Sequence, residues 1–548
     1  MGGIMKKYLL HIKNNIIMQV IMDGLATASL ALLPYLQKLL FDSISGKNSY
    51  HLLSIITIYS LLILLSLSFT YFDQINIWKG TIKFEKILKK DFFNAITNYS
   101  YKRFYSKDVG DYISIQGNEI TQLDMDYVTP LIDIFKSINM IIIYGIVLFV
   151  LIDWRIGLLI VGASILVTFV PRITADKLSK KRKRYLDTKG KYISKMKDLL
   201  EGFKLINGKT KNSINKEHEE ILNKTADKRY SYGKFKVVSL LLNGSFIHLL
   251  NVLSLGLAGY LMIKGEITIG TAVASLGYMN SFIEPIERLT YNINSISSVK
   301  DIKEKVKMYL TYDQSNVIQK KEFNNSIEFK NVTIHHKNFS LKDFNYEFKK
   351  GKKYAIIGHS GCGKSTVVNA LMKYIEPNDG EIFIDGEYNQ KIDTSEIISS
   401  VNQHEHIYMT NYKNNITVYN SFPIKNINKI KNSISEKMFN AIAEKENCQK
   451  LSGGEKNILS LMRMISEDKE ICVMDEVLSS TDMNTTEQLY NMIINLENKT
   501  LIMVTHKLNQ RLSEFDEIIL MKDGEMAKSG TYEEIIEDEY YKFLSNIM

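Results

Sequence analysis

Cysteine is scarce in this sequence, with only three residues, Cys362, Cys448 and Cys472, among 548. All three lie in the second half of the chain, and none is spaced from another as Cys-x-x-Cys. This pattern predicts neither a zinc site nor a redox-active pair. Thiols without a partner pattern are typical of a protein whose cysteines face the reducing cytosol.

An excess of acidic charge is also missing, because 69 Lys and Arg residues outnumber 60 Asp and Glu residues and give a formal net charge of +9. The basic residues gather between apolar runs, most densely at residues 180–184, Lys-Lys-Arg-Lys-Arg. In a membrane protein, basic loops of this kind mark the cytoplasmic side. We therefore attribute the positive charge to membrane topology and expect no nucleic-acid partner.

The N-terminus lacks the small-residue cleavage site of a signal peptide, although residues 1–13 are basic and lead into an apolar run. The run continues to Leu39 and Leu40, so we expect a first membrane-spanning helix instead. A spanning helix needs about 20 mostly apolar residues. Six segments qualify: residues 14–37, 52–77, 128–152, 155–172, 237–263 and 268–290.

The connections between these six segments differ in length and charge. Three of them are short and carry few basic residues. The other two, residues 78–127 and 173–236, are long, rich in Lys and Arg, and patterned like helices. The positive-inside rule then places the two long connections and both termini in the cytoplasm. Helices that extend this far from the membrane suit contact with a cytoplasmic domain.

Several ionisable residues fall within the apolar segments, where charge is costly and therefore indicates function by default. Asp133 and Lys136 are three residues apart and could pair on one helix face. Asp23 is the residue for which we most expect a direct role toward a substrate. The favoured explanation for the whole set is that its members lie near helix ends, pair with each other or line a wet cavity: Asp23, Asp133, Lys136, His248 and Glu284.

A phosphate-binding motif opens the second half of the chain. Residues 358–366 read Gly-His-Ser-Gly-Cys-Gly-Lys-Ser-Thr, between a short apolar strand and a helix. Glycines let the backbone amides turn toward a phosphate at a helix N-terminus. Lys364 adds a charge for the β- and γ-phosphates, and the Ser365 hydroxyl can ligate Mg²⁺. The predicted ATP or GTP site comprises Gly358, Ser360, Gly361, Cys362, Gly363, Lys364, Ser365 and Thr366.

Two carboxylates follow a second apolar strand about 110 residues downstream. Residues 471–476 read Ile-Cys-Val-Met-Asp-Glu, which predicts a buried strand with acids at its end. Asp475 would belong to the Mg²⁺ shell, and Glu476 could polarise the attacking water.

Residues 451–455, Leu-Ser-Gly-Gly-Glu, resemble the signature of ABC transporters, whose fifth residue is usually Gln. In the first half, residues 110–114 and 201–206 are similar to stretches of the membrane domain of ABC exporters. The resemblance implies that Ser452, Gly453 and Gly454 form an anion site facing the γ-phosphate bound by another cassette. Because this chain carries one cassette, the resemblance implies a dimer.

The resemblance assigns four further roles. Gln403 looks like the glutamine that senses Mg²⁺ and the γ-phosphate, Asp482 lies in a segment like the D-loop, and His506 looks like the switch histidine. His336 stands where the family usually stacks a Tyr on adenine, which favours altered nucleotide affinity. Residues 443–448 replace the family's usual sequence before the signature, so the coupling of cassette and membrane domain is expected to differ.

These observations predict a membrane domain (1–300) with six helices, a linker (301–326) and an α/β P-loop ATP-binding domain (327–548). The expected function is ATP-driven export of a peptide, drug or lipid, with a peptide preferred, by alternating access in a homodimer in the plasma membrane of a bacterium. An importer built on the same fold and one half of a heterodimer remain alternatives. A soluble, non-transport ABC ATPase is a further alternative, but it should show two cassettes and no spanning segments.

Overall fold

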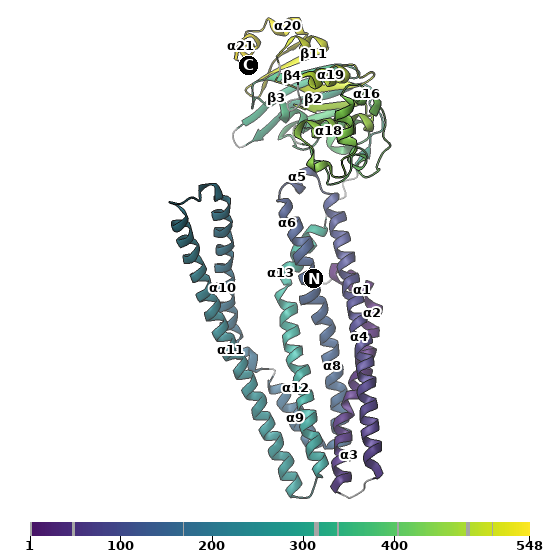
Figure 1. Ribbon diagram of the computed structural model, residues 1–548, viewed down its shortest axis with the longest axis vertical. Coiled ribbons are helices and arrows are strands. Elements are labelled where there is room, and N and C mark those ends of the chain that lie inside the picture. Colours follow the sequence, from purple (N-terminus) through teal and green to yellow (C-terminus); the bar gives the residue numbers. More distant parts are fainter. Residues whose placement is uncertain are drawn as a thin grey trace. The chain divides into compact units, whose positions relative to one another are not determined.

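The computed structural model describes residues 3–45, 50–167, 169–311, 317–336, 339–402, 405–477, 483–506 and 508–547. The chain forms two compact units, one of Met1–Thr97 with Asp108–Tyr312 and one of Asn98–Lys107 with Asp313–Met548. The first is helical and the second contains the strands (Figure 1).

The first unit consists of long helices joined by short turns. Its π-helical turns η1 (Ile115–Glu119), η2 (Asp124–Val128) and η3 (Leu148–Ile152) continue neighbouring α-helices, and η4 (Phe203–Leu205) is a 3-10 turn. Its described α-helices are α1 (Gly3–His11), α2 (Lys13–Ala31), α3 (Leu33–Ser45), α4 (Tyr50–Thr97), α6 (Val109–Ser114), α7 (Ile120–Leu123), α8 (Thr129–Val147), α9 (Trp154–Val167), α10 (Val170–Glu201), α11 (Lys211–Ile263), α12 (Ile269–Ser298) and α13 (Lys300–Leu310).

Helices occupy all six predicted spanning segments over their described residues. Among the described residues, four helical runs are long and apolar enough to cross a membrane: Lys13–Ile44, Leu52–Thr97, Val109–Ile152 and Lys211–Ile263. The fourth predicted segment contains the short α9, and the sixth contains α12, which is long but more polar. The number of six spanning helices therefore stays a prediction.

Packing within this unit follows the apolar faces of the helices. Helix α2 packs on α4 and α8, and α12 packs on α3 and α8. Helices α10 and α11 run side by side (Figure 1). Tyr278 of α12 is fully buried, and its hydroxyl donates to the carbonyl oxygen of Ala31 at 2.5 Å. This bond ties α12 to the end of α2.

The ionisable residues of the apolar segments pair differently from the expectation. Lys136 of α8 does not pair with Asp133; its ammonium forms a buried ion pair with Asp73 of α4. Side-chain exposure is 9% for Lys136 and 3% for Asp73. At this depth a charge needs a partner that is equally removed from solvent, and α4 supplies one.

Asp23 and Glu284 also have polar partners, and His248 is exposed. Asp23 accepts a hydrogen bond from the Asn139 amide at 3.4 Å. Glu284 pairs with Arg288 one turn away at 2.5 Å.

The contributions of Lys136 and Asp73 to the free energy of unfolding are expected to be coupled. Lys136→Met should destabilise the chain by about 3–5 kcal/mol, because it leaves Asp73 charged and buried. Combining Lys136→Met with Asp73→Leu should recover most of that loss, since no unpaired charge remains. Thermal denaturation of the full chain in detergent measures both effects.

Glu284→Gln serves as the control, because it breaks an exposed pair and should cost under about 1 kcal/mol. Equal melting of the single and double variants at the Lys136–Asp73 pair would contradict the coupling.

The described residues of the second unit form three sheets. A six-stranded sheet has the order β12-β11-β4-β10-β9-β8, a four-stranded sheet the order β3-β2-β5-β6, and β1 pairs with β7. The strands are β1 (Ile318–Gln319), β2 (Ser326–His336), β3 (Phe339–Lys349), β4 (Lys353–Gly358), β5 (Asp379–Ile384), β6 (Glu387–Tyr388), β7 (Ile392–Asp393), β8 (Ile398–Val401), β9 (Ile471–Asp475), β10 (Thr500–Val504), β11 (Glu517–Lys522) and β12 (Glu525–Gly530).

The helices of this unit cover both faces of the six-stranded sheet and fill the turns around it. The unit also has the 3-10 turns η5 (Asn389–Lys391), η6 (Cys448–Lys450) and η7 (Gln510–Glu514). Its α-helices are α5 (Tyr101–Phe104), α14 (Lys364–Leu371), α15 (Tyr412–Thr417), α16 (Ile427–Lys431), α17 (Glu436–Ala443), α18 (Gly453–Glu467), α19 (Met483–Ile494), α20 (Tyr532–Ile536) and α21 (Glu539–Ile547).

Strands β4, β9, β10 and β11 of the six-stranded sheet are buried on both faces, which explains their mostly apolar runs. Along β4, Ala355 and Ile357 enter one hydrophobic cluster, whereas Tyr354 and Ile356 enter the other. Strands β9, β10 and β11 alternate in the same way. A shift of one residue would exchange the two sets of side chains, so packing fixes the register.

Residues 98–107 belong to the second unit, although the expected division placed them in the membrane domain. The ring of Tyr101 on α5 stacks on Tyr374, with centroids 4.4 Å apart. Lys102 forms an ion pair with Glu376 at 2.6 Å. These contacts explain why this short segment clusters with residues almost 300 positions later.

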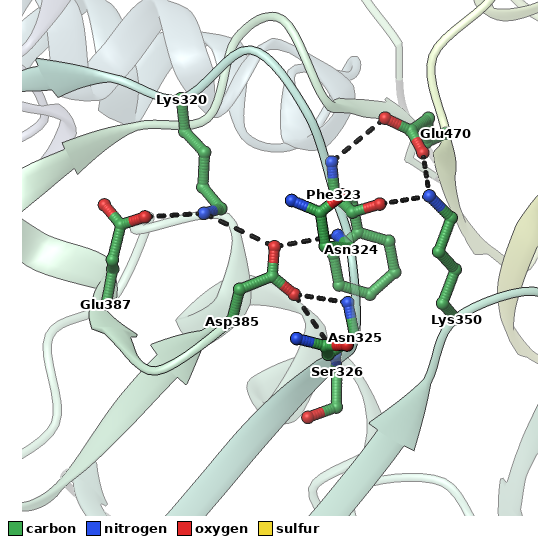
Figure 2. Close-up of polar contacts among 9 residues, drawn as sticks. All are labelled: Lys320, Phe323, Asn324, Asn325, Ser326, Lys350, Asp385, Glu387 and Glu470. Atoms are coloured by element: carbon green, nitrogen blue, oxygen red, sulfur yellow. Dashed lines mark hydrogen bonds and ion pairs between the residues drawn. The ribbon is translucent and has the colours of Figure 1, made fainter.

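A network of charged side chains holds the start of the second unit (Figure 2). The Asp385 carboxylate accepts backbone N–H bonds from Asn324, Asn325 and Ser326 at 2.7–3.2 Å and lies 3.3 Å from the Lys320 ammonium. Burial alone would raise the pKa of Asp385, but these donors hold that pKa below its usual range. The carboxylate therefore anchors the chain where it enters β2.

Asp385→Asn should loosen this entry, because the amide cannot accept all of these bonds and its NH₂ faces other donors. We expect a loss of about 2–3 kcal/mol and faster amide hydrogen exchange at residues 324–326, read by mass spectrometry. Since the pKa of Asp385 is lowered in the folded chain, its contribution is complete at neutral pH and is lost as the pH falls below the ordinary carboxyl range.

The matched control for this variant is Glu387→Gln, which alters only the ion pair between Lys320 and the exposed Glu387. It should leave exchange at residues 324–326 unchanged. Equal protection in the Asp385 variant and the parent would refute the anchoring role.

Candidate functional site

Three neighbouring strands place the residues predicted to act on phosphate at one edge of the sheet. Strands β4, β10 and β9 are adjacent and parallel, so their carboxyl ends meet. The ladder continues past the strands, because the Glu476 N–H donates to the Val504 oxygen at 3.2 Å and the Thr505 N–H donates to the Ile356 oxygen at 3.1 Å. Motifs separated by more than 140 residues therefore converge.

The loop after β4 needs its glycines. Gly358 and Gly363 have φ angles of 149° and 107°, and Gly361 has 83°. A Cβ on Gly358 would lie 2.3 Å from the Met521 carbonyl oxygen, and one on Gly363 would lie 2.8 Å from the Phe339 ring. A side chain at Gly358 or Gly363 would clash with these neighbours, so the loop requires glycine at both positions.

Lys364 is the cation of this loop. Its ammonium donates to the carbonyl oxygens of Gly358 at 2.9 Å and His359 at 3.0 Å, and the residue is buried. The charge is thus held inside the loop that opens α14. Ser360 and Ser365 are exposed, Thr366 is half-buried, and the Cys362 thiol packs in the hydrophobic core. Burial raises the pKa of Cys362, so its thiol stays neutral in this core.

Asp475 ends β9 beside Ser365. Asp475 is 9% exposed, and its Oδ1 atom has no hydrogen-bond partner among the residues that the structure describes. Burial raises the pKa of Asp475, while a hydrogen bond with Ser365 opposes that rise. A buried carboxylate oxygen without a partner is costly. Carboxylate and hydroxyl oxygens are ligands that Mg²⁺ prefers, so this pair fits that cation.

Glu476 and His506 face each other across the ends of β9 and β10. The Glu476 Oε1 atom lies 3.4 Å from Nδ1 of His506, and Glu476 itself adopts a left-handed φ of 53°. The two side chains line a cavity of about 390 Å³ together with Thr505 and Arg511. A carboxylate and an imidazole in contact can hold a water and move its proton.

The signature residues lie elsewhere in the unit. Ser452, Gly453 and Gly454 open α18, which packs on α15 and β8, whereas α14 packs on β4 and β9. The departure from Gln to Glu455 forms a capping box: Glu455 accepts the Ser452 N–H at 2.8 Å, and the Ser452 hydroxyl oxygen accepts the Glu455 N–H at 3.4 Å. This box stabilises the helix N-terminus at which the anion site is expected.

Three predicted site residues are not placed. Gln403 and Asp482 lie outside the described residues, and the structure describes His336 only as the last residue of β2 and not its side chain. Two contacts were not predicted from the sequence: that of Asp73 with Lys136 and that of Tyr540 with the P-loop. Neither has a signal in the local sequence.

Comparison with known proteins covers both units. Residues 16–286 match the model of the ABC transporter transmembrane region, and residues 341–479 match that of the ABC transporter. This chain belongs to the ABC transporter family. The predicted resemblance and the fold class, a helical membrane domain with an α/β ATPase, are confirmed.

Individual relatives match this chain over most of its length. The chain is 24% identical over 575 residues to the multidrug resistance-like ATP-binding protein MdlB of Buchnera aphidicola, with 98% of this chain and 97% of that protein covered. It is 23% identical to the ATP-dependent lipid A-core flippase of Photobacterium profundum, with 71% and 69% covered. A solved structure of a bacterial Atm1-family ABC exporter with ATP bound has a TM-score of 0.83 at 18% identity, covering 98% and 99%.

Family membership gives the site its general meaning. The second unit is an ABC ATPase domain that binds ATP, and the chain is an ATP-hydrolysing half-transporter. A half-transporter of this fold is embedded in a membrane through several helices and works as a dimer.

Asp475→Asn tests the cation fit. Removal of the charge should raise the Mg²⁺ concentration for half-maximal ATPase activity at least about tenfold, since the amide is a weaker ligand for this hard cation. Titration of ATPase activity with Mg²⁺ measures the shift. Asp343→Asn, on the four-stranded sheet, is the control and should leave the Mg²⁺ dependence unchanged. An unaltered dependence in the Asp475 variant would exclude Asp475 from the cation shell.

Proposed function

We propose that this chain exports an organic substrate across the cytoplasmic membrane, driven by ATP, as a homodimer that alternates between two access states. The observation that carries the proposal is the convergence of Lys364, Asp475, Glu476 and His506 at one sheet edge, in the chain that also holds the membrane region. Loop charge supports a cytoplasmic ATPase unit and cytoplasmic termini.

The ATPase residues divide the chemistry among them. Lys364 binds the phosphates, Glu476 takes a proton from the attacking water, and His506 orients Glu476 and the γ-phosphate. Ser365, Asp475 and Gln403 would hold Mg²⁺, which when bound supplies charge neutralisation at the phosphates. Ser452, Gly453 and Gly454, with Asp482, would complete the site of the partner chain, because within one chain α18 lies apart from the P-loop helix.

ATP binding can drive transport only through its different affinity for the two access states. Two ATP molecules held between the cassettes would favour the closed pair, and hydrolysis would release it. Residues 98–107 suit the transfer of this motion, because they are continuous with membrane helices α4 and α6 while Tyr101 and Lys102 bind within the ATPase unit. His336 and the altered residues 443–448 would tune affinity and coupling.

The names of the relatives change which class of substrate is favoured. Their names concern multidrug resistance and a lipid, so an amphipathic drug or lipid has support, whereas the preferred peptide has none from these relatives.

Transport assays in inside-out vesicles distinguish the substrates and the direction. ATP-dependent accumulation of a fluorescent amphipathic drug or lipid inside such vesicles supports export. ATP-dependent loss of the same preloaded compound from them would instead show import and contradict the proposal. A peptide substrate would appear as stimulation of ATPase activity in nanodiscs by peptides but not by drugs or lipids.

Glu476→Gln isolates the catalytic step. Hydrolysis should fall at least about 100-fold, because the amide cannot accept the proton of the water, while ATP binding is retained and the closed dimer accumulates. ATPase rates and bound nucleotide per chain are the measurements. Glu497→Gln, at an exposed position, is the matched control. Undiminished turnover in the Glu476 variant would remove Glu476 from the role of base.

A further inference from the structure

The C-terminal helix reaches the P-loop. The hydroxyl of Tyr540 on α21 and Nδ1 of His359, the second residue of the P-loop motif, are hydrogen-bonded at 2.5 Å. On the other side of the ring, Nε2 of His359 lies 3.6 Å from the Asp523 carboxylate in the turn between β11 and β12. A proton on Nε2 facing Asp523 leaves Nδ1 to accept from the Tyr540 hydroxyl. Both ring nitrogens are therefore occupied.

Tyr540 is held firmly enough to act as a support. Its neighbours Tyr541 and Leu544 are 5% and 4% exposed and anchor α21 in the core. The N–H of Tyr540 donates to Asp538 at 2.8 Å at the start of the helix, and the Lys522 ammonium lies 4.9 Å from the ring centroid. The Tyr540 hydroxyl is protonated at neutral pH, and burial raises its pKa further.

The contact has a direct connection to the phosphate-binding cation. The backbone oxygen of His359, whose ring is fixed by Tyr540 and Asp523, accepts a hydrogen bond from Lys364 at 3.0 Å. On the far side of the loop, the Gly524 N–H donates to the Cys362 oxygen at 3.2 Å. The P-loop is thus supported from outside by the turn between β11 and β12 and by α21.

We propose that Tyr540 is a positioning residue that sets the ATP affinity of the P-loop through His359. The inference rests on the proposed nucleotide site. Helix α21 then does more than close the fold: it preorganises the loop amides and Lys364 for phosphate, and a displacement of α21 would weaken ATP binding without touching Glu476 or His506. Preorganisation of a binding loop acts on affinity, because it removes an ordering cost from the binding step.

The test compares Tyr540→Phe with Tyr541→Phe in the full chain in nanodiscs. Each change removes one hydroxyl from the same helix, but the Tyr541 hydroxyl is hydrogen-bonded with Tyr532, whereas that of Tyr540 is hydrogen-bonded with His359. Tyr540→Phe should raise the KM for ATP and the Kd of a fluorescent ATP analogue about fivefold, the effect of about one hydrogen bond, with kcat at saturating ATP within about twofold. Tyr541→Phe should leave KM and Kd unchanged.

A second comparison shows whether His359 transmits the effect. In a His359→Ala background, Tyr540→Phe should cause no further rise in KM. An unchanged KM in Tyr540→Phe, or equal losses of kcat in both tyrosine variants, would overturn the proposal and leave a purely structural role. Failure of the parent chain to bind the ATP analogue would instead refute the nucleotide site itself, so the two failures are distinguishable.

Discussion

The parallel hydrogen bonding of β4, β10 and β9 determines where Lys364, Asp475, Glu476 and His506 lie. Each strand is buried on both faces, so its side chains fix the register, and each delivers its next residues to the same edge. The register pairs Val504 with both Ile356 and Asp475. From that alignment follow the contact of Glu476 with His506 and the place of Asp475 beside Ser365. A slipped strand would separate Glu476, Asp475 and the P-loop from one another.

How far the amino-acid sequence predicts this protein depends on the distance between contacting residues. The P-loop and the acidic pair are contiguous motifs whose flanking apolar runs predict strands, and β4, which ends at Gly358, and β9, which ends at Asp475, confirm those strands. The pairing of Lys136 is different, because Asp133 on the same helix has the spacing of a partner. The actual partner, Asp73, lies 63 residues away on another helix.

The same limit applies to Tyr540, which contacts His359 across 181 residues. Nothing in the local sequence of α21 distinguishes Tyr540 from Tyr541, because only the docking of the helix decides which hydroxyl faces the P-loop. Residues 98–107 are a third case: their basic, aromatic sequence suits a loop, and only the stacking of Tyr101 on Tyr374 shows that they join the ATPase unit.

The central claim of the proposed function is that each ATP site is shared between two chains, with the P-loop of one chain facing the signature residues around Ser452 of the other. Mixed dimers test it directly by counting photo-crosslinked ATP analogue. A Lys364→Ala chain paired with a Ser452→Arg chain should keep one complete site and label about once per dimer. A chain carrying both changes, paired with an unaltered chain, should keep none. The reverse result would contradict shared sites and show that each chain completes its own.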